Sequence, residues 1–233
     1  MKLRLLAAAL AAITLTVGAA SAQDMTSERG KLSYALGYDL GRNLAESGES
    51  IDVNTVIKAV QDGYGKKDPG VPVEQLRVAV ENMQKRQQAK MQAEFNKLAA
   101  DNKAKSDAFL AQNRSKSGVR TLPSGVQYRV VETGNGAKPS QASDVQITYK
   151  GTLPDGTVLI DTNQAREGQP AGPVSMKVNQ IPLVGLREAL TQMPAGSRWE
   201  VVLPGNVAYG TDMQAGRMAN QAVVFDVKLV SVR

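Results

Sequence analysis

The chain has 233 residues, with 28 Lys and Arg against 22 Asp and Glu, and it contains neither Cys nor His. Without Cys there is no disulfide framework and no cysteine for a lipid anchor, and without His there is no Ser-His or Cys-His nucleophile pair and no His-ligated zinc. Catalysis must therefore use carboxylates, hydroxyls, backbone amides or the shape of a pocket, and we expect no metal and no other cofactor.

Residues 1–22 predict a secretory signal peptide. Lys2 and Arg4 precede an apolar run from Leu5 to Val17, and small residues lead to Ala22. The run is too short to span a membrane and has no charged face of the kind that interfacial anchors carry. We therefore expect cleavage near Ala22 and a periplasmic or secreted protein without a membrane anchor. Loss of Lys2 and Arg4 leaves 26 basic and 22 acidic side chains with no polybasic run, so no nucleic-acid partner is expected.

Residues 23–70 predict a helical module that pairs with a second copy of itself. In KLSYALGYDLGRNL the leucines recur every fourth residue beside a line of two glycines: Leu32, Leu36, Leu40 and Leu44, with Gly37 and Gly41. A second helix is expected after Asp52, its N-cap, with Val53, Ile57 and Val60 on one face. Each helix is too short to bury its apolar stripe alone, and no third apolar element follows closely. The sequence therefore predicts a homodimer through these N-terminal helices.

Residues 71–117 predict a long linker helix. From residue 73 onward the segment contains neither Gly nor Pro. Gln87, Lys90 and Glu94 occupy positions where a heptad repeat would continue, so a sustained coiled coil is not expected. Its Ala, Gln, Lys and Glu content favours a helix over a disordered linker, and we interpret it as a solvent-exposed strut between domains.

Residues 118–233 predict an α+β domain. Apolar side chains alternate with polar ones in five runs, at residues 126–130, 145–149, 174–178, 199–203 and 223–229. Alternation with period two is typical of half-buried strands. Between the third and fourth runs, a short helix is expected with Leu186, Leu190 and Met193 facing inward. The pattern indicates an antiparallel sheet wrapped over one short helix.

Several motifs occur here in a specific order. TLPSGVQYRVVETGNG, VQITYKGTLPDGT, GLREALTQMPAGSRWEVVLPGNVAYG and VVFDVKLVSV follow one another along the chain. In this order they resemble the FKBP-type peptidyl-prolyl isomerase domain over residues 119–233. KLSYALGYDLGRNL and the long helix resemble the dimerisation module of the macrophage infectivity potentiator class of periplasmic FKBPs. The resemblance implies cis/trans interconversion of Xaa-Pro bonds in proline-containing segments of unfolded or exported proteins.

The resemblance also implies a set of site residues. By motif position the catalytic residues are Tyr149, Tyr209 and Asp161, and the substrate-binding residues are Leu159, Met176, Leu183, Leu186 and Phe225. Tyr209 is expected to offer its hydroxyl to the substrate carbonyl, while Tyr149 and Phe225 form walls around the prolyl ring. Ordinary packing on an inward strand face is an alternative explanation for Tyr149 and Phe225.

The segment after DGT departs from the family pattern. Where the family has a Phe-Asp pair this chain has Val158-Leu159-Ile160-Asp161, so in an ungapped comparison Leu159 replaces the Phe and Ile160 replaces the Asp. A one-residue β-bulge would bring Asp161 back to the pocket. Otherwise Asp161 is an Asx-turn residue that opens DTNQ, and the sequence leaves both possibilities open.

Other departures affect the pocket floor and its rim. Leu186 stands where the family usually has Trp, and Leu183 where a branched aliphatic residue is expected. Arg217 and Met218 occupy a rim loop that is commonly apolar in the family. We therefore expect reduced but remaining isomerase activity and weak binding of macrolide inhibitors such as rapamycin. The alternative function is a dimeric periplasmic chaperone with weak or no isomerase activity.

Overall fold

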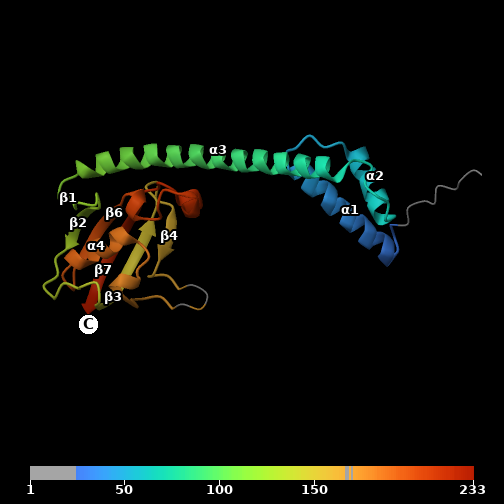
Figure 1. The fold of residues 1–233 in the computed structure, drawn as a ribbon. Coiled ribbons are helices and arrows are strands. Elements are labelled where there is room, and N and C mark those ends of the chain that lie inside the picture. The colour runs from blue at the N-terminus through green and yellow to red at the C-terminus, as the bar shows by residue number, and fades with distance from the viewer. Residues whose placement is uncertain (1–24, 166–167, 169) are drawn as a thin grey trace, which may run out of the picture. The chain divides into compact units, whose positions relative to one another are not determined.

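The computed structural model describes residues 25–165, 168 and 170–233, so the signal peptide expected at residues 1–22 lies outside the described part (Figure 1). The chain divides into two compact units, one ending at Met83 and the other running from Gln84 to Arg233. The helix α3 (Val73–Arg114) contributes to both units. None of the described helices is long and apolar enough to cross a membrane.

The first unit contains two capped helices ahead of the start of α3. α1 (Glu28–Glu46) begins after Ser27, whose hydroxyl accepts a hydrogen bond from the backbone N–H of Gly30 at 3.1 Å. α2 (Val53–Tyr64) begins after Asp52, whose carboxylate accepts from the N–H of Asn54 at 3.0 Å. Each cap satisfies one of the N–H groups that a helix start leaves without a partner in the helix. The N-cap predicted at Asp52 is therefore confirmed.

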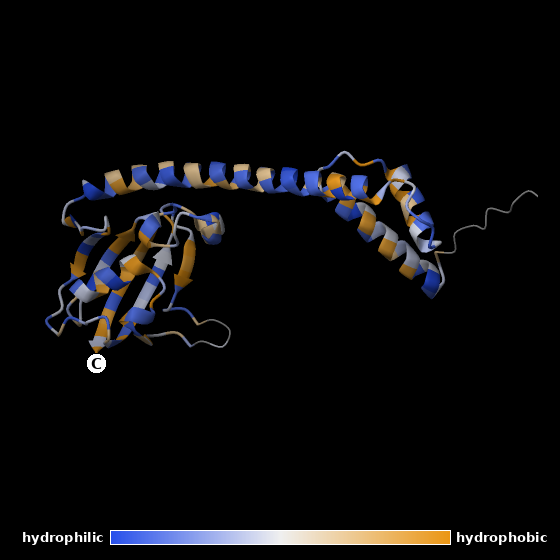
Figure 2. Cartoon of the chain, viewed as in Figure 1, coloured by the Kyte–Doolittle hydropathy of each residue, from blue (hydrophilic) through white to orange (hydrophobic). Residues whose placement is uncertain are grey.

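The apolar stripes of α1 and α2 are exposed to solvent in the single chain. No residue of either helix is buried, and apolar residues recur along both (Figure 2). Leu36 is 65% exposed and Ile57 is 51% exposed. A methyl group added at Gly37 or Gly41 would meet none of the described residues within 4 Å. The first unit therefore has the predicted amphipathic helices, and none of its described residues is buried in a core.

α3 is one continuous helix of 42 residues, as predicted. Its interpretation as a solvent-exposed strut is wrong for its C-terminal part, where Asn102, Ser106 and Asn113 are buried. Asn113 donates a hydrogen bond to the Gln127 side chain at 2.9 Å, and Gln127 donates to the backbone O of Leu110 at 3.0 Å. The end of α3 is thus joined by hydrogen bonds to the first residue of a strand.

In the described part of the second unit, seven strands form one antiparallel sheet. The strands are β1 (Val119–Thr121), β2 (Gln127–Glu132), β3 (Asp144–Thr152), β4 (Val158–Asp161), β5 (Val174–Lys177), β6 (Arg198–Leu203) and β7 (Val223–Val232). Their order across the sheet is β1-β2-β6-β7-β3-β4, and β5 also pairs with β3. Within this sheet β3 pairs with β4, β5 and β7.

The core of the second unit lies between the sheet and α4 (Val184–Gln192), which crosses the sheet in Figure 1. Leu186, Leu190 and Met193 all point into this core, and each is at most 3% exposed. The predicted inward face of the short helix is therefore confirmed. The domain is the predicted α+β fold, an antiparallel sheet wrapped over one short α-helix.

Candidate active site

A row of three residues crosses the sheet at Gly151. Gly151 on β3 pairs with Ile160 on β4 and with Phe225 on β7. A Cβ atom at Gly151 would lie 2.8 Å from Cε1 of Phe225 and 2.9 Å from Cγ2 of Ile160, so the two side chains occupy the space above the glycine. Tyr149, two residues away, shares this face, and its ring centroid lies 6.1 Å from that of Phe225 with the planes at 58°. An apolar cluster thus forms at this edge of the sheet.

A cavity of about 470 Å³ lies beside this cluster. Residues of β3, β4, β5 and the β4–β5 connection line it, namely Tyr149, Ile160, Asp161, Thr162, Gln164, Pro170, Val174, Ser175 and Met176. The lining combines apolar side chains with one carboxylate and several neutral polar groups. Such a combination can hold an apolar ring and orient a polar group beside it.

β4 carries one extra residue relative to β3. Gly151 pairs with Ile160 while the next residue, Thr152, pairs with Val158, so Leu159 is an extra residue between two consecutive pairs of the register. This two-against-one pairing is a β-bulge. Leu159 packs against the core and is not among the residues that line the cavity, whereas Ile160 lines it. The bulge therefore places Ile160, rather than Leu159, at the cavity.

Asp161 ends β4 beside the cavity. It is 7% exposed and lines the cavity together with Tyr149. Its Oδ1 also accepts hydrogen bonds from the backbone N–H of Asn163 at 2.9 Å and from the Asn163 side chain at 3.0 Å. The bond to the backbone two residues ahead is an Asx-turn. The two sequence-based alternatives are therefore not exclusive, since Asp161 both borders the cavity and anchors a turn.

Thr162 holds the backbone of Tyr149 from the neighbouring strand end. The Thr162 hydroxyl accepts from the N–H of Tyr149 at 2.9 Å, and the N–H of Thr162 donates to the carbonyl of Tyr149 at 3.0 Å. Sequence reasoning missed Thr162 as a lining residue, and it also missed Gln164 and Pro170. They lie in a connection without periodicity, so only their nearness to Asp161 in the chain could have suggested them.

Four of the remaining expected residues lie in three different settings. Met176 lines the cavity, and Phe225 is 2% exposed against Tyr149. Leu183 and Leu186 belong to the start of α4, where Leu186 is buried in the core and Leu183 packs against it. Their contact with substrate remains a prediction, because neither is among the described residues that line this cavity.

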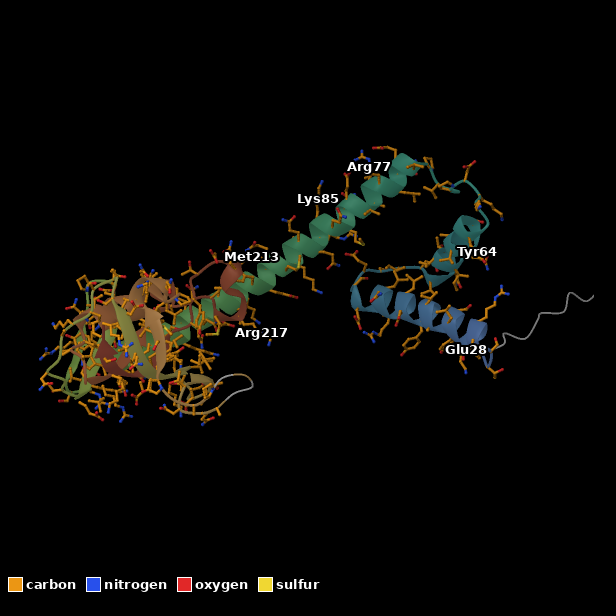
Figure 3. The ribbon with its side chains drawn as sticks, turned by 90° about the horizontal axis from the view of Figure 1, so that it is seen from below. Glu28, Tyr64, Arg77, Lys85, Met213 and Arg217 are labelled. Atoms are coloured by element: carbon orange, nitrogen blue, oxygen red, sulfur yellow. The ribbon has the colours of Figure 1, made fainter. Side chains whose placement is uncertain are left out.

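Tyr209 lies on the loop that joins β6 to β7. It follows the short 3-10 helix η2 (Gly205–Val207) and is 41% exposed. The same loop contains η3 (Met213–Met218), whose Met213 and Arg217 are exposed beside α3 (Figure 3). Tyr209 is not among the described lining residues of the cavity, so its role also remains a prediction.

The lining groups of this site are suited to binding a peptide through contacts and hydrogen bonds. Over residues 25–165, 168 and 170–233, no three His, Cys, Asp or Glu side chains gather where a metal ion could be held. The cavity instead offers aromatic and aliphatic surfaces, a buried carboxylate and hydroxyl groups. Such a site can select one shape and charge distribution of a bound peptide over another.

Comparisons with known proteins agree with this geometry. The chain matches the family described as FKBP-type peptidyl-prolyl cis-trans isomerase over residues 135–230, and the domain amino terminal to it over residues 29–130. It is 41% identical to the outer membrane protein MIP of Legionella longbeachae, covering 100% of this chain and 99% of that protein. It is 34% identical to the peptidyl-prolyl cis-trans isomerase Mip of Coxiella burnetii, covering 95% of this chain and 94% of that protein.

Among solved structures, the crystal structure of FkpA from Escherichia coli matches with a TM-score of 0.67 and 30% identity. The match covers 89% of this chain and 98% of that chain. The helical N-terminal region, the long helix and the sheet domain thus all have counterparts in relatives of similar length. The chain belongs to the FKBP-type peptidyl-prolyl cis-trans isomerases and is an enzyme of that family.

Proposed function

We propose that this isomerase assists the folding of exported proteins, and that Xaa-Pro bonds rotate at the cavity bounded by β3, β4 and β5. One observation carries the proposal. Tyr149 and Asp161 line a single cavity with Ile160 and Met176, although Asp161 is displaced by one residue in the sequence. Phe225 supports Tyr149 from the adjacent strand.

Rotation of an Xaa-Pro bond needs no bond cleavage, so the residues available suffice. The barrier of about 18 to 20 kcal/mol comes from amide resonance. A site lowers it by binding the twisted imide more tightly than either planar form. The twisted imide has lost its dipolar resonance form, so an apolar pocket disfavours it less than it disfavours the planar ground states. Ile160 and Met176 supply that apolar surface in the cavity, and we expect Phe225, packed against Tyr149, to extend it.

Tyr209 is proposed to act from the loop that follows β6. Its hydroxyl would donate a hydrogen bond to the substrate carbonyl, whose position changes as the imide twists. Such a bond raises the rate only where it is stronger in the twisted state than in the planar states. Tyr209 is 41% exposed, so part of this residue is accessible to a bound peptide.

Exchange NMR on a short Xaa-Pro peptide tests the catalytic part of the proposal. Tyr209→Phe should lower the acceleration about tenfold, the effect of losing one hydrogen bond in the transition state. Tyr64→Phe removes a hydroxyl from an 88% exposed tyrosine of α2 and is the matched control. Unchanged acceleration in both Tyr209→Phe and Phe225→Ala would contradict the proposed site, and no acceleration by the unmodified chain would favour a chaperone instead.

The export part of the proposal rests on residues 1–22 and on the name of the Legionella longbeachae relative, an outer membrane protein. We propose that cleavage after Ala22 releases the protein into the periplasm. Sequencing of the mature N-terminus from the periplasmic fraction should begin at Gln23. A chain retained in the cytoplasm with Met1 intact would contradict this.

We also propose that the N-terminal unit forms a homodimer. The apolar stripes of α1 and α2 are exposed in the single chain, and no described residue would lie within 4 Å of a methyl group added at Gly37 or Gly41. A second copy brings an identical stripe, and paired glycines allow two backbones to approach closely. Sedimentation equilibrium should show a dimer that Leu36→Glu converts to a monomer. Ala35→Glu, one residue away and so off the stripe, should leave the dimer intact.

A further inference from the structure

Three of the four buried residues of α3 are polar. Ala99, Asn102, Ser106 and Asn113 are each at most 8% exposed, and they recur at the three- and four-residue spacing of one helix face. Burial of an amide or a hydroxyl is costly unless it is hydrogen-bonded. The partners of Asn102 and Ser106 therefore indicate what this face of the helix does.

Asn102 and Ser106 bind the backbone of the loop between β6 and β7. Nδ2 of Asn102 donates to the carbonyl of Arg217 at 3.0 Å and to the carbonyl of Ala219 at 2.9 Å. Oγ of Ser106 accepts from the N–H of Ala222 at 2.8 Å. The two side chains thus fix three backbone groups of this loop, and Figure 3 shows η3 beside α3.

Asn220 of the loop donates a hydrogen bond in the opposite direction, back to α3. Its Nδ2 donates to the carbonyl of Ala99 on α3 at 3.1 Å. Its own backbone has φ of 59°, in the left-handed region that Asn tolerates better than most residues. Its N–H donates to the carbonyl of Gly210 at 2.9 Å. Asn220 therefore joins α3 to the residue that directly follows Tyr209.

Gly205, which precedes Tyr209 in the chain, is also held by close backbone contacts. The N–H of Gly210 donates to the carbonyl of Gly205 at 2.9 Å. A Cβ atom at Gly205 would lie 2.4 Å from the backbone carbon of Asn220, so only glycine allows this contact. Tyr209 thus lies in a turn closed by Gly205 and Gly210, and Asn220 packs against both ends of it.

We propose that Asn102 and Ser106 are positioning residues for Tyr209. α3 holds Asn220 and its neighbours, Asn220 holds Gly210, and the turn holds the tyrosine. The inference rests on the proposed role of the Tyr209 hydroxyl. Because Tyr209 is 41% exposed, burial alone does not fix its place, and the backbone bonds of the loop must do so. A displacement of the order of 1 Å can cost a large part of a catalytic contact.

A double-mutant cycle in the full chain tests the proposal by exchange NMR. Asn102→Ala should lower kcat/KM about fivefold, the order of one or two weakened hydrogen bonds. In the Tyr209→Phe background the same change should have almost no further effect, because the hydroxyl it positions is absent. Asn96→Ala, on the exposed face of the same helix, is the matched control and should leave kcat/KM unchanged.

Amide exchange supplies a second readout. In Asn102→Ala, the N–H groups of Asn220 and Gly210 should exchange about tenfold faster, while those of the β3–β7 pairing should keep their protection. If Asn102→Ala does not fold, Ser106→Ala can replace it, because it removes only the acceptor of the Ala222 N–H. It should lower kcat/KM and speed amide exchange in the same way, but by less.

The outcomes separate this inference from the proposed function. An active parent chain with equal kcat/KM in Asn102→Ala and Asn96→Ala would overturn the positioning role and leave the proposed function intact. Equal losses from Asn102→Ala with and without the Tyr209 hydroxyl would also overturn it, since the helix would then act on stability alone. An inactive parent chain would overturn the proposed function, and the positioning role with it.

Discussion

The two units differ in how they bury the apolar residues that their sequences supply. In the unit from Gln84 onward, Ile147, Val227 and Leu229 are fully buried between the sheet and α4. In the unit up to Met83, Leu36 is 65% exposed on a helix with an equally regular stripe. Periodicity therefore identifies which side chains require burial, but it does not say whether the same chain supplies the partner.

Of the substitutions considered, Phe225→Ala should lower stability the most, because it removes a buried ring from the core of the sheet domain. The ring is 2% exposed, packs against Tyr149 and fills the space above Gly151. We expect a loss of about 3 to 5 kcal/mol in the unfolding free energy of the sheet domain, together with most of the isomerase activity. Urea unfolding measures the first, with Val230→Ala as the control on the same strand, since Val230 is 39% exposed. Similar losses in the two variants would contradict a core centred on Phe225.

Gly151→Ala should have a smaller effect at the same place. The added methyl group would lie within 3 Å of Phe225 and Ile160, so both must move. We expect a cost of about 1 to 3 kcal/mol from overpacking, and a fall in isomerase activity because Ile160 lines the cavity. Urea unfolding and peptide exchange NMR measure the two effects. A variant as stable and active as the parent would show that the contact relaxes freely.

Gly37→Ala makes the same Gly→Ala change in the first unit. Its effect should differ most clearly from that of Gly151→Ala in the second unit. None of the described residues lies within 4 Å of the added methyl group, and alanine favours a helix by about 0.5 to 1 kcal/mol over glycine. A single chain should therefore tolerate the change or gain helix stability. If a second copy packs closely there, the dimer dissociation constant should rise about tenfold, a change of about 1.4 kcal/mol. If sedimentation equilibrium shows an unchanged dissociation constant, the two helices do not approach closely at Gly37 in the dimer.

Asp226→Asn should have the smallest effect. Arg198 on β6 donates two hydrogen bonds to the Asp226 carboxylate, at 2.8 and 2.6 Å, and this raises the pKa of Arg198 above its ordinary value. Both side chains are more than 40% exposed, so solvent screens the pair. We expect a loss of about 0.5 to 1 kcal/mol that shrinks as salt is added. A salt-independent loss in urea unfolding would indicate that the change disturbs the sheet itself.

Much of the fold was predictable because periodicity and capping are local properties of the sequence. The Asp52 cap and the inward residues of α4 lie where the pattern indicated. The buried face of α3 was not predictable, because Asn102 and Ser106 are residues that a pattern assigns to solvent. They are buried through bonds to a loop more than 100 residues away in the chain.

The site was predictable in part for a similar reason. Tyr149 follows from strand alternation and a motif, but the placement of Asp161 depends on the bulge at Leu159. A bulge depends on how two strands pair, so the sequence of one strand does not reveal it. Thr162 lines the cavity only because the chain turns immediately after β4.

The most direct test of the account is the effect of Asp161→Asn on proline exchange. Asparagine keeps the Oδ1 acceptor of the turn at Asn163 and removes the charge beside the cavity. Asp155→Asn is the matched control, since its Oδ1 accepts from the N–H of Thr157 in an exposed turn. Exchange NMR should show about tenfold less acceleration for Asp161→Asn and none lost for Asp155→Asn. Full activity in Asp161→Asn would mean that Asp161 serves only the turn and that catalysis takes place without it.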